Sequence, residues 1–114
     1  MNKVWLIFGG SGFVGTNLIL NLIKKNKIIC VDINKKNNTN LLKLLSKNEK
    51  KKIKIINKSI IKYNDLESIF RNQYFDIIVN LAALTSVNET SLNPKKTLLT
   101  NVKGFENILQ LMKK

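Results

Sequence analysis

Val4-Trp5-Leu6-Ile7-Phe8 runs directly into Gly9-Gly10-Ser11-Gly12-Phe13-Val14-Gly15 near the start of the chain. The first segment is an apolar run of strand length, and the second combines a glycine turn with the beginning of an amphipathic stretch. A second apolar run, Ile28-Ile29-Cys30-Val31, leads to Asp32, which follows Gly15 by 17 residues. A strand, a glycine turn, a helix and a second strand that ends in an acid together predict a βαβ unit that binds a dinucleotide.

The three glycines of the G-x-x-G-x-x-G spacing have separate predicted roles. Gly9 is expected to form the tight turn, because a side chain would oppose the backbone angles needed there. Gly12 lacks a Cβ atom, so a pyrophosphate can approach its backbone, and Gly15 is expected to let the new helix lie against the strand. The helix begins near Phe13 and offers the phosphates free N–H groups and the positive end of its dipole.

Asp32 lies where a carboxylate accepts hydrogen bonds from both hydroxyl groups of the adenosine ribose. A 2′-phosphate would meet a like charge there, so the sequence predicts NAD as the cofactor, with NADP less favoured. Lys35 and Lys36 follow closely and favour a phosphate, which leaves NADP open. The other alternative is a glycine turn that binds nothing, and the strands and helix around the turn argue against it.

The length and composition limit the class of protein. A chain of 114 residues can form one domain with a modest core, and residues 1–114 are expected to be a single dinucleotide-binding domain. The one cysteine lies in an apolar run, so an internal disulfide is excluded and a reducing compartment, the cytoplasm, is predicted. No apolar run is long enough to cross a membrane, so no membrane partner is expected.

The formal net charge is +13, from 20 basic and 7 acidic residues, an excess that is common in proteins that bind nucleic acid. The basic residues are almost all lysine, with Arg71 as the one arginine, whereas base recognition and bidentate phosphate contacts favour arginine. The lysines are also spread along the chain, with one cluster at Lys50–Lys52. We therefore expect a solvated basic surface and no specific nucleic-acid partner.

Short apolar runs alternate with longer amphipathic stretches, a pattern typical of a parallel α/β sheet. The segment 34–40 is polar and is predicted as a loop. Right-handed crossovers then give a Rossmann-type sheet with helices on both faces, incomplete at about four strands, in the order 3-2-1-4. The strands are predicted at about 4–8, 28–32, 53–57 and 76–80, and the helices at about 13–25, 41–48, 64–72 and 93–113.

Apolar residues at helical spacing predict which faces are buried. In the first helix these are Val14, Leu18, Ile19, Leu22 and Ile23. The last helix has a wider stripe, which serves either core packing or a homodimer surface, and core packing is favoured. Its members are Leu98, Val102, Phe105, Leu109 and Met112, widened by Leu99, Ile108 and Leu111.

With the segment after the fourth strand included, the chain resembles the extended short-chain dehydrogenase/reductase family. Within it, the chain is similar to the NAD-dependent epimerase/dehydratase group, which acts on nucleotide sugars. The resemblance covers essentially the whole chain and begins with the glycine segment Gly9–Gly15. The later matching segments are Asn80-Leu81-Ala82-Ala83 with Val87 and Ser91, then Asn93-Pro94, and then Asn101-Val102-Lys103-Gly104.

The resemblance implies a role for each matching position. Phe13 and Val14 join the three glycines around the pyrophosphate, and Asp32 holds the adenosine ribose. Leu81, Ala82 and Ala83 lie along the cofactor, with Thr85 near its nicotinamide half and Asn101 helping to organise the active site.

The chain departs from the family pattern after the third strand. The family has an aspartate followed by an aliphatic residue there, and this pair contacts the adenine. Here the positions are Ser59 and Ile60. A serine hydroxyl still accepts a hydrogen bond from the adenine amine, but more weakly than a carboxylate does.

A second departure concerns catalysis, which in this family depends on a Tyr-x-x-x-Lys and a preceding Ser or Thr. Tyr63 and Tyr74 are followed four residues later by Glu67 and Ile78. The chain has no histidine, and no metal-ligand cluster is evident. No catalytic residue is therefore predicted. The resemblance implies the N-terminal, cofactor-binding part of an enzyme whose complete form acts on a nucleotide sugar.

Two other functions stay open at this point. One is a non-catalytic dinucleotide-binding module, acting as a redox sensor or as a partner subunit. The other is an NADP-dependent reductase of the same fold. The sugar, and the choice between epimerase and dehydratase, are not specified by these residues.

Overall fold

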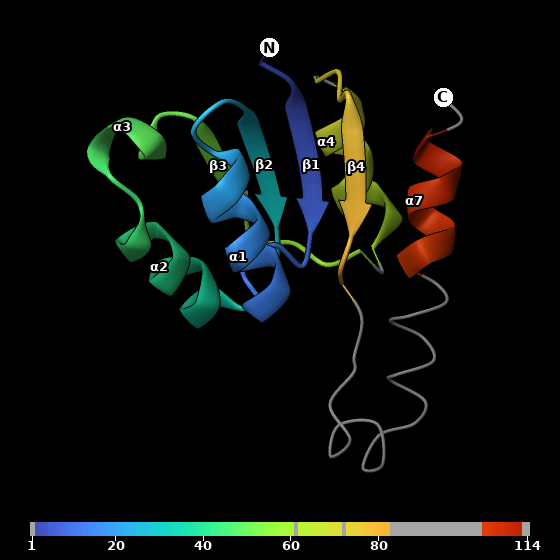
Figure 1. The fold of residues 1–114 in the computed structure, drawn as a ribbon. Helices are drawn as coiled ribbons and strands as arrows, with labels where there is room; N and C mark the ends of the chain where they lie inside the picture. Colours follow the sequence, from blue (N-terminus) through green and yellow to red (C-terminus); the bar gives the residue numbers. More distant parts are fainter. Residues whose placement is uncertain (1, 61, 72, 83–103, 113–114) are drawn as a thin grey trace. The chain divides into compact units, whose positions relative to one another are not determined.

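The computed structural model describes residues 2–60, 62–71, 73–82 and 104–112 (Figure 1). The chain divides into two compact units, each described here by itself. The first unit is Met1–Lys58 with Tyr74–Leu81, and the second is Ser59–Gln73 with Ala82–Lys114. The prediction of a single domain over residues 1–114 therefore stays a prediction.

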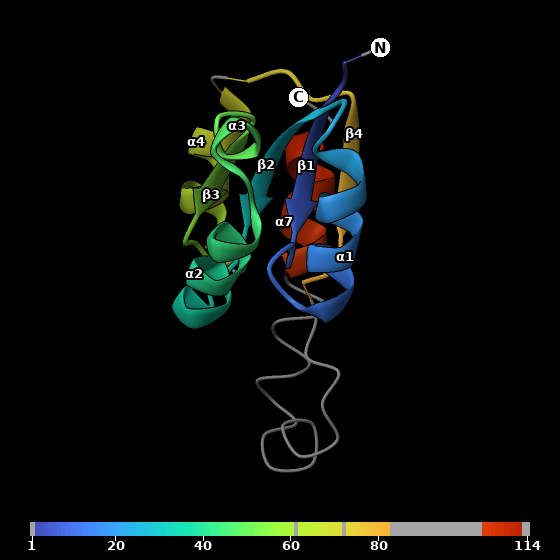
Figure 2. The ribbon, with the colours of Figure 1, turned by 60° about the vertical axis from the view of Figure 1, so that its left-hand side comes forward.

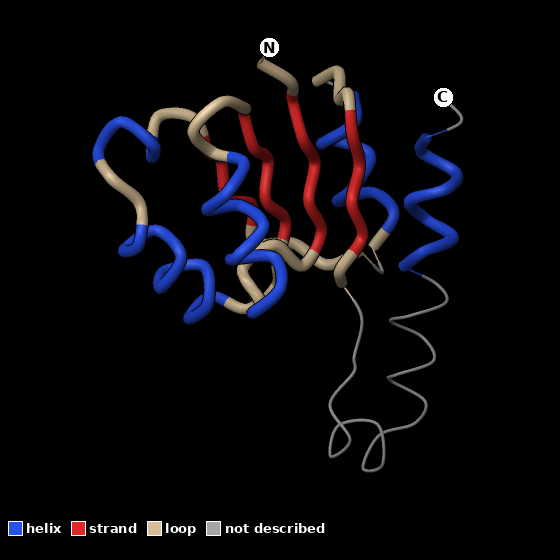
Figure 3. The backbone as a smooth tube through the Cα atoms, in the orientation of Figure 1, coloured by secondary structure: helices blue, strands red, loops and turns tan. Residues whose placement is uncertain are grey.

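The first unit contains a parallel sheet whose strands lie in the order β3-β2-β1-β4, which confirms the predicted order 3-2-1-4 (Figure 1). The arrangement places Leu6 of β1 opposite Ile29 on one side and Ile78 on the other. The carboxyl ends of β1 and β2 therefore meet at one end of the sheet, where the loops to the next helices leave (Figure 3). The strands are β1 (Val4–Phe8), β2 (Lys27–Val31), β3 (Ile53–Ile56) and β4 (Ile77–Asn80).

One face of the sheet forms a core with helices α1 (Phe13–Leu22) and α2 (Lys35–Leu44). Helix α1 lies alongside the sheet in both ribbon views (Figures 1 and 2). Alternate residues of β1 and β2 point to this face because the side-chain period of a strand is two. The buried members of the core are Ile7, Ile19, Ile23, Ile28, Cys30, Leu41 and Leu45. The predicted cover of the other sheet face falls on the second unit and stays a prediction.

The first helix is shorter than predicted, and the residue that it buries in its first turn differs from the predicted one. It ends at Leu22 and not near residue 25, with Ile23 as its C-cap. Ile19 and Ile23 are buried as predicted, but Val14 is 62% exposed and Gly15 takes the inward position. The prediction that Val14 packs inward is therefore wrong, because the first turn of α1 extends past the end of the sheet core.

The segment 34–40, predicted as a loop, forms most of α2. The Asn34 side chain caps this helix by accepting a hydrogen bond from the Asn37 N–H at 2.9 Å. The predicted helix at 41–48 is also wrong, since α2 ends at Leu44 and a separate turn, α3 (Lys47–Lys50), follows. Ser46 and Glu49 begin α3 with a capping box, a sequence signal that marks a new helix start.

The second unit contains α4 (Tyr63–Arg71), which contacts α7 (Gly104–Met112). Leu66, Ile69, Ile108 and Leu111 are buried. Leu109 and Met112 are 42% and 54% exposed, so the prediction that these two residues lie on the buried stripe is wrong. The rest of the last predicted helix, residues 93–103, lies outside the described residues.

Candidate functional site

The glycine turn joins the carboxyl end of β1 to α1. Gly9 has a φ of 74°, the left-handed conformation that a side chain disfavours, which confirms its predicted role in the turn. Its N–H donates to the Val31 carbonyl at 2.8 Å, so the turn continues the pairing of β1 with β2. The Gly12 N–H donates back to the Gly9 carbonyl at 3.3 Å and closes the turn.

The first turn of α1 begins directly above this loop. Gly12 is the N-cap of α1, and no side chain caps this helix. The first turn of α1 contains no acidic residue. The first intrahelical bond runs from the Thr16 N–H to the Gly12 carbonyl at 2.8 Å. The N–H groups of Phe13, Val14 and Gly15 find no acceptor in the part of the chain that the structure describes. They form the positive end of the helix, which suits an anion.

Gly12 leaves the space that a dinucleotide phosphate needs. A Cβ atom built on Gly12 would have one neighbour within 4 Å, the Gly9 carbonyl oxygen at 3.5 Å, which is ordinary contact. A methyl group there would therefore fit the chain itself and would occupy the approach to the α1 N–H groups. Phe13, at 86% exposed, and the exposed Val14 border the same approach. These residues fit a pyrophosphate.

Gly15 packs closely against the backbone of the glycine turn. A Cβ atom on Gly15 would lie 2.5 Å from both the Cα and the carbonyl oxygen of Gly10. Such distances are well inside van der Waals contact. Gly15 therefore allows the first turn of α1 to lie directly on the Gly10 backbone, and this contact fixes the direction of the helix N-terminus.

Gly10 is the residue that the sequence analysis left without a role. It is buried, and a Cβ atom on it would lie 2.6 Å from Cys30 Sγ and 3.0 Å from Ile19 Cδ1. Because Gly10 has no side chain, the turn can pack directly on Cys30 and Ile19 of the core. The Gly9-Gly10 doublet was the available signal, but the steric reason depends on Cys30, which is distant in sequence.

Replacing Gly10 by alanine is expected to destabilise the protein by about 1–3 kcal/mol, the usual cost of overpacking a core. Most of this cost should come from Cys30 Sγ, so Gly10→Ala combined with Cys30→Ala should show a favourable coupling of about 1–2 kcal/mol. Urea denaturation of the two single variants and the double variant measures the coupling. Strictly additive effects would contradict the proposed contact.

Cys30 is buried and does not act as a reactive thiol. Burial, together with the negative charge of Asp32, raises its pKa from 9.0 to about 12, against a smaller opposing effect of a hydrogen bond from the Gly10 backbone. The thiol is therefore neutral near pH 7 in the folded protein. The unfolded chain ionises first as the pH rises, so the stability that the buried neutral thiol contributes is present below pH 9 and is lost between about pH 9 and 12.

This linkage predicts that the difference in unfolding free energy between the wild type and Cys30→Ala shrinks from pH 9 to pH 12. The other ionisable groups are common to both proteins, so their contributions cancel in the difference. Denaturant unfolding of both proteins at a series of pH values measures the trend. A difference that stays constant over this range would contradict a raised pKa for Cys30.

Asp32 lies directly after β2, with its carboxylate held toward the glycine turn. Oδ2 accepts a hydrogen bond from the Ser11 N–H at 3.3 Å, and Oδ1 accepts one from the Asn34 N–H at 2.9 Å. The first bond connects the two parts of the predicted site, the phosphate turn and the ribose carboxylate. The structure thus brings Gly9, Gly12, Gly15 and Asp32 together at one end of the sheet.

Ser11 is a second residue that the sequence analysis left without a role. Its N–H reaches Asp32, and its carbonyl accepts a hydrogen bond from Thr16 Oγ1 at 3.1 Å. Its hydroxyl is buried and has no hydrogen-bond partner among the described residues. A serine between two glycines carries no pattern that would have indicated these bonds.

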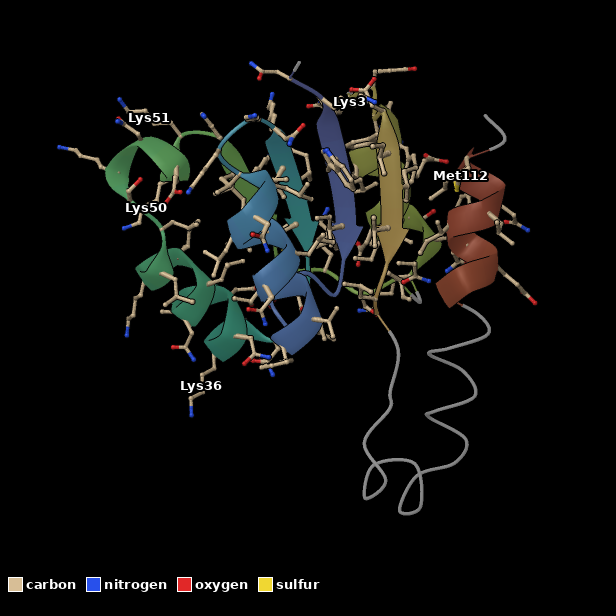
Figure 4. The ribbon with its side chains drawn as sticks, in the orientation of Figure 1. Lys3, Lys36, Lys50, Lys51 and Met112 are labelled. Carbon is tan, nitrogen blue, oxygen red and sulfur yellow. The ribbon has the colours of Figure 1, made fainter. Side chains whose placement is uncertain are left out.

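Two groups of lysines lie at opposite ends of the sheet. Lys35 and Lys36 are exposed in the first turn of α2, just after Asp32, and Lys36 extends outward from the helix (Figure 4). Lys50 and Lys51 lie on and after α3, and Lys3 precedes β1, at the other end (Figure 4). Lys3, Lys50 and Lys51 are therefore remote from the glycine turn and do not form its phosphate site.

The other predicted cofactor residues fall into three groups. Leu81 donates its N–H to the Phe8 carbonyl at 2.8 Å, which extends the pairing of β4 with β1 next to the glycine turn. Ser59 and Ile60 begin the second unit, where the buried Ile60 accepts a hydrogen bond from Asn107 Nδ2 at 2.8 Å through its carbonyl. Ala82 is half-buried, and Ala83, Thr85 and Asn101 lie outside the described residues. The cofactor contacts of this set stay predictions.

The described residues contain neither a metal-binding cluster nor a membrane-spanning helix. No group of three or more His, Cys, Asp or Glu side chains gathers there in a way that could hold a metal ion. None of the helices in residues 2–60, 62–71, 73–82 and 104–112 is long and apolar enough to span a membrane.

Comparison with solved structures identifies the fold. The structure is similar to UDP-glucose-4-epimerase from Stenotrophomonas maltophila, which was solved with bound NAD and formylated UDP-arabinopyranose. The TM-score is 0.84 at 19% sequence identity, and the match covers 97% of this chain and 33% of that chain.

Two curated relatives are more similar in sequence. Protein CapI of Staphylococcus aureus is 35% identical over 113 residues, which is 92% of this chain and 32% of that protein. The dTDP-D-glucose 4,6-dehydratase of Dictyostelium discoideum is 33% identical over 111 residues, which is 95% of this chain and 25% of that protein. The chain thus spans a quarter to a third of the length of these relatives.

A family model described as GDP-mannose 4,6 dehydratase matches residues 6–114, nearly the whole chain. This match confirms the resemblance drawn from the glycine segment and from Asn80–Ala83. The chain belongs to the GDP-mannose 4,6 dehydratase family, within the NAD-dependent epimerase/dehydratase group of extended short-chain dehydrogenases/reductases.

Proposed function

We propose that this chain binds NAD in the site formed by the glycine turn, the N-terminus of α1 and Asp32, as the cofactor-binding part of a nucleotide-sugar epimerase or dehydratase. The observation that carries the proposal is the open approach over Gly12 to the N–H groups of Phe13, Val14 and Gly15. The Asp32 carboxylate lies one hydrogen bond from this turn. An anionic pyrophosphate and a neighbouring ribose match these two features.

In this proposal each residue binds or orients the cofactor. The N–H groups of α1 donate to the pyrophosphate oxygens, and Gly12 admits them to hydrogen-bond distance. Asp32 accepts hydrogen bonds from the ribose hydroxyls and repels a 2′-phosphate, which favours NAD over NADP. When bound, NAD supplies a nicotinamide ring that takes a hydride from a sugar carbon and returns it.

The substrate class follows from the relatives and not from contacts in this chain. The Dictyostelium relative is a dTDP-D-glucose 4,6-dehydratase, and the Stenotrophomonas structure holds a UDP sugar. This sequence contains no Tyr-x-x-x-Lys and no histidine. We therefore expect this chain by itself to bind NAD without converting a nucleotide sugar, and we expect it to do so in the cytoplasm.

The alanine variant at Gly12 tests the proposal without disturbing the fold. Gly12 has a φ of −71° and room for a methyl group, so Gly12→Ala should fold with unchanged stability. The methyl group should nevertheless keep the pyrophosphate from the α1 N–H groups and lower the affinity for NAD at least about tenfold, since each charge-assisted hydrogen bond contributes about 1.5–3 kcal/mol.

Calorimetric titration of NAD into the wild type and into Gly12→Ala measures this effect. Lys50→Ala is the control, because it removes a charge remote from the turn and should leave the affinity unchanged. A folded wild-type chain that does not bind NAD would overturn the proposal. Equal affinity of the wild type and Gly12→Ala would show that NAD binds elsewhere on the chain.

A further inference from the structure

The backbone of Asp32 is held more tightly than a strand end requires. Its N–H donates to the Ile56 carbonyl of β3 at 3.0 Å, which is ordinary sheet pairing. Its carbonyl then accepts two side-chain hydrogen bonds, from Asn38 Nδ2 at 3.1 Å and from Asn57 Nδ2 at 3.2 Å. The two amides come from different elements, since Asn38 lies on α2 and Asn57 follows β3.

The chemistry of the two asparagines fixes how they bind. A carbonyl oxygen has two lone pairs, so the Asp32 carbonyl can accept both bonds, and an amide NH₂ has two hydrogens. Asn57 Nδ2 uses its second hydrogen on the Ile33 carbonyl at 3.0 Å, so it spans two successive peptide groups. We call the two side chains, Asn38 and Asn57, the amide clamp.

Asn38 makes its bond at a cost to the folded state. The residue is 7% exposed, and its Oδ1 atom is buried without a hydrogen-bond partner among the described residues. A buried, unsatisfied acceptor lowers stability. The orientation of the amide is nevertheless determined, because only the NH₂ group can bond to the Asp32 carbonyl.

The amide clamp holds the backbone carbonyl of Asp32, and the carboxylate of the same residue faces the glycine turn. With the peptide groups of Asp32 and Ile33 fixed, the Asp32 side chain has little freedom except at its own torsions. The Ser11 and Asn34 N–H groups then hold its two carboxylate oxygens. Loss of one clamp residue releases the peptide and lets the carboxylate move away from the turn.

We propose that Asn38 and Asn57 are positioning residues that fix the Asp32 carboxylate and thereby set the preference of the site for NAD over NADP. This inference rests on the proposed function. It assigns selectivity to residues that are not expected to touch the cofactor. A carboxylate that is held in place accepts hydrogen bonds from both ribose hydroxyls and repels a 2′-phosphate. A mobile carboxylate binds the ribose more weakly and repels the 2′-phosphate less.

The test compares the affinities of NAD and NADP for the wild type, Asn57→Ala and Asn38→Ala. Asn57 is exposed, so Asn57→Ala should fold normally even if the buried Asn38→Ala is unstable. Asn40→Ala is the matched control, because Asn40 is an exposed asparagine on the same helix. Amide NMR spectra without cofactor give a second readout, at the Ser11 and Asn34 signals.

Asn57→Ala should weaken NAD binding about three- to tenfold, the usual effect of one or two hydrogen bonds, and should weaken NADP binding less. The ratio of the two affinities should therefore narrow, and the Ser11 and Asn34 amide signals should shift, with no change in Asn40→Ala. A purely structural role would lower both affinities equally and keep the ratio.

The two possible failures are distinguishable. A wild type that prefers NAD, with the same ratio in Asn57→Ala, overturns the clamp and leaves the proposed function intact. A folded wild type that binds neither dinucleotide overturns the proposed function, and with it the role of the clamp in selectivity.

Discussion

Replacing Gly15 by alanine is expected to be the most destabilising single change at the glycine turn. A methyl group there would lie 2.5 Å from the Cα and the carbonyl oxygen of Gly10 and 2.6 Å from its carbonyl carbon. All three are backbone atoms and none can rotate away. The first turn of α1 would have to lift off the turn, which disrupts the packing of Ile19 on the core.

Two opposing effects decide the size of this change. Alanine favours a helix interior over glycine by about 1 kcal/mol, so helix propensity alone would make Gly15→Ala stabilising. A backbone clash that moves a packed helix costs about 3 kcal/mol or more. The steric effect is the larger, and we expect a net loss of about 2 kcal/mol or more in the free energy of unfolding.

Urea denaturation of Gly15→Ala beside Gly12→Ala measures this prediction. The two glycines are separated by two residues, but a methyl group at Gly12 meets one atom at ordinary contact distance. Gly12→Ala should therefore be as stable as the wild type. Equal stability of the two variants would contradict the close contact between Gly15 and Gly10.

Replacing Asp32 by alanine is expected to have the largest effect on cofactor choice. In the proposed site the change removes two charge-assisted hydrogen bonds to the ribose, each of about 1.5–3 kcal/mol, so NAD affinity should fall about a hundredfold. NADP affinity should fall far less or rise, since the change removes a repulsive charge while Lys35 and Lys36 remain close by on α2. The ratio of the two affinities should invert or approach one.

The matched control is Asp76→Ala. Asp76 also holds a backbone N–H with its carboxylate, that of Val4 at 2.8 Å, but it does so where β1 begins, at the opposite end of the sheet. Both variants lose a carboxylate that accepts a backbone hydrogen bond, and only Asp32→Ala should change the binding of NAD. A similar loss of affinity in both variants would mean that Asp32 acts on folding and not on the ribose.

The strands were predictable because their apolar runs are bounded by strong signals. The first strand, Val4–Phe8, was placed at its observed bounds since Gly9 ends it. The second strand was predicted to end at Asp32, and it ends one residue earlier, at Val31, so that Asp32 follows it directly. The order of the strands followed from right-handed crossovers, which leave few alternatives for alternating strands and helices.

Helix α2 was not predictable from hydrophobic pattern, because its first half, Lys35–Asn40, contains no apolar residue. This half is a helix because of specific polar bonds: the Asn34 cap, the bond from Asn38 to the Asp32 carbonyl, and the bond from Thr39 Oγ1 to the Lys35 carbonyl. The bond from Asn38 depends on where β2 ends, which local propensity does not encode.

In the candidate site, too, some features follow from the local sequence and others depend on the fold. The turn conformation of Gly9 follows from its own backbone and was predictable from the glycine spacing. The contacts of Gly10 with Cys30 and of Gly15 with Gly10 depend on how α1 lies over the turn, so they appear only in three dimensions. The amide clamp likewise joins Asn38 and Asn57 at one carbonyl, although the two residues are 19 positions apart in sequence.

The most direct test of the NAD site is a titration of NAD into isotopically labelled protein, followed through the backbone amide signals. If NAD binds at the glycine turn, the signals of Phe13, Val14 and Gly15 should shift most and saturate, and those of Lys50–Lys52 should stay unchanged. Shifts centred on the lysines, or none in a folded chain, would contradict a dinucleotide site at the glycine turn.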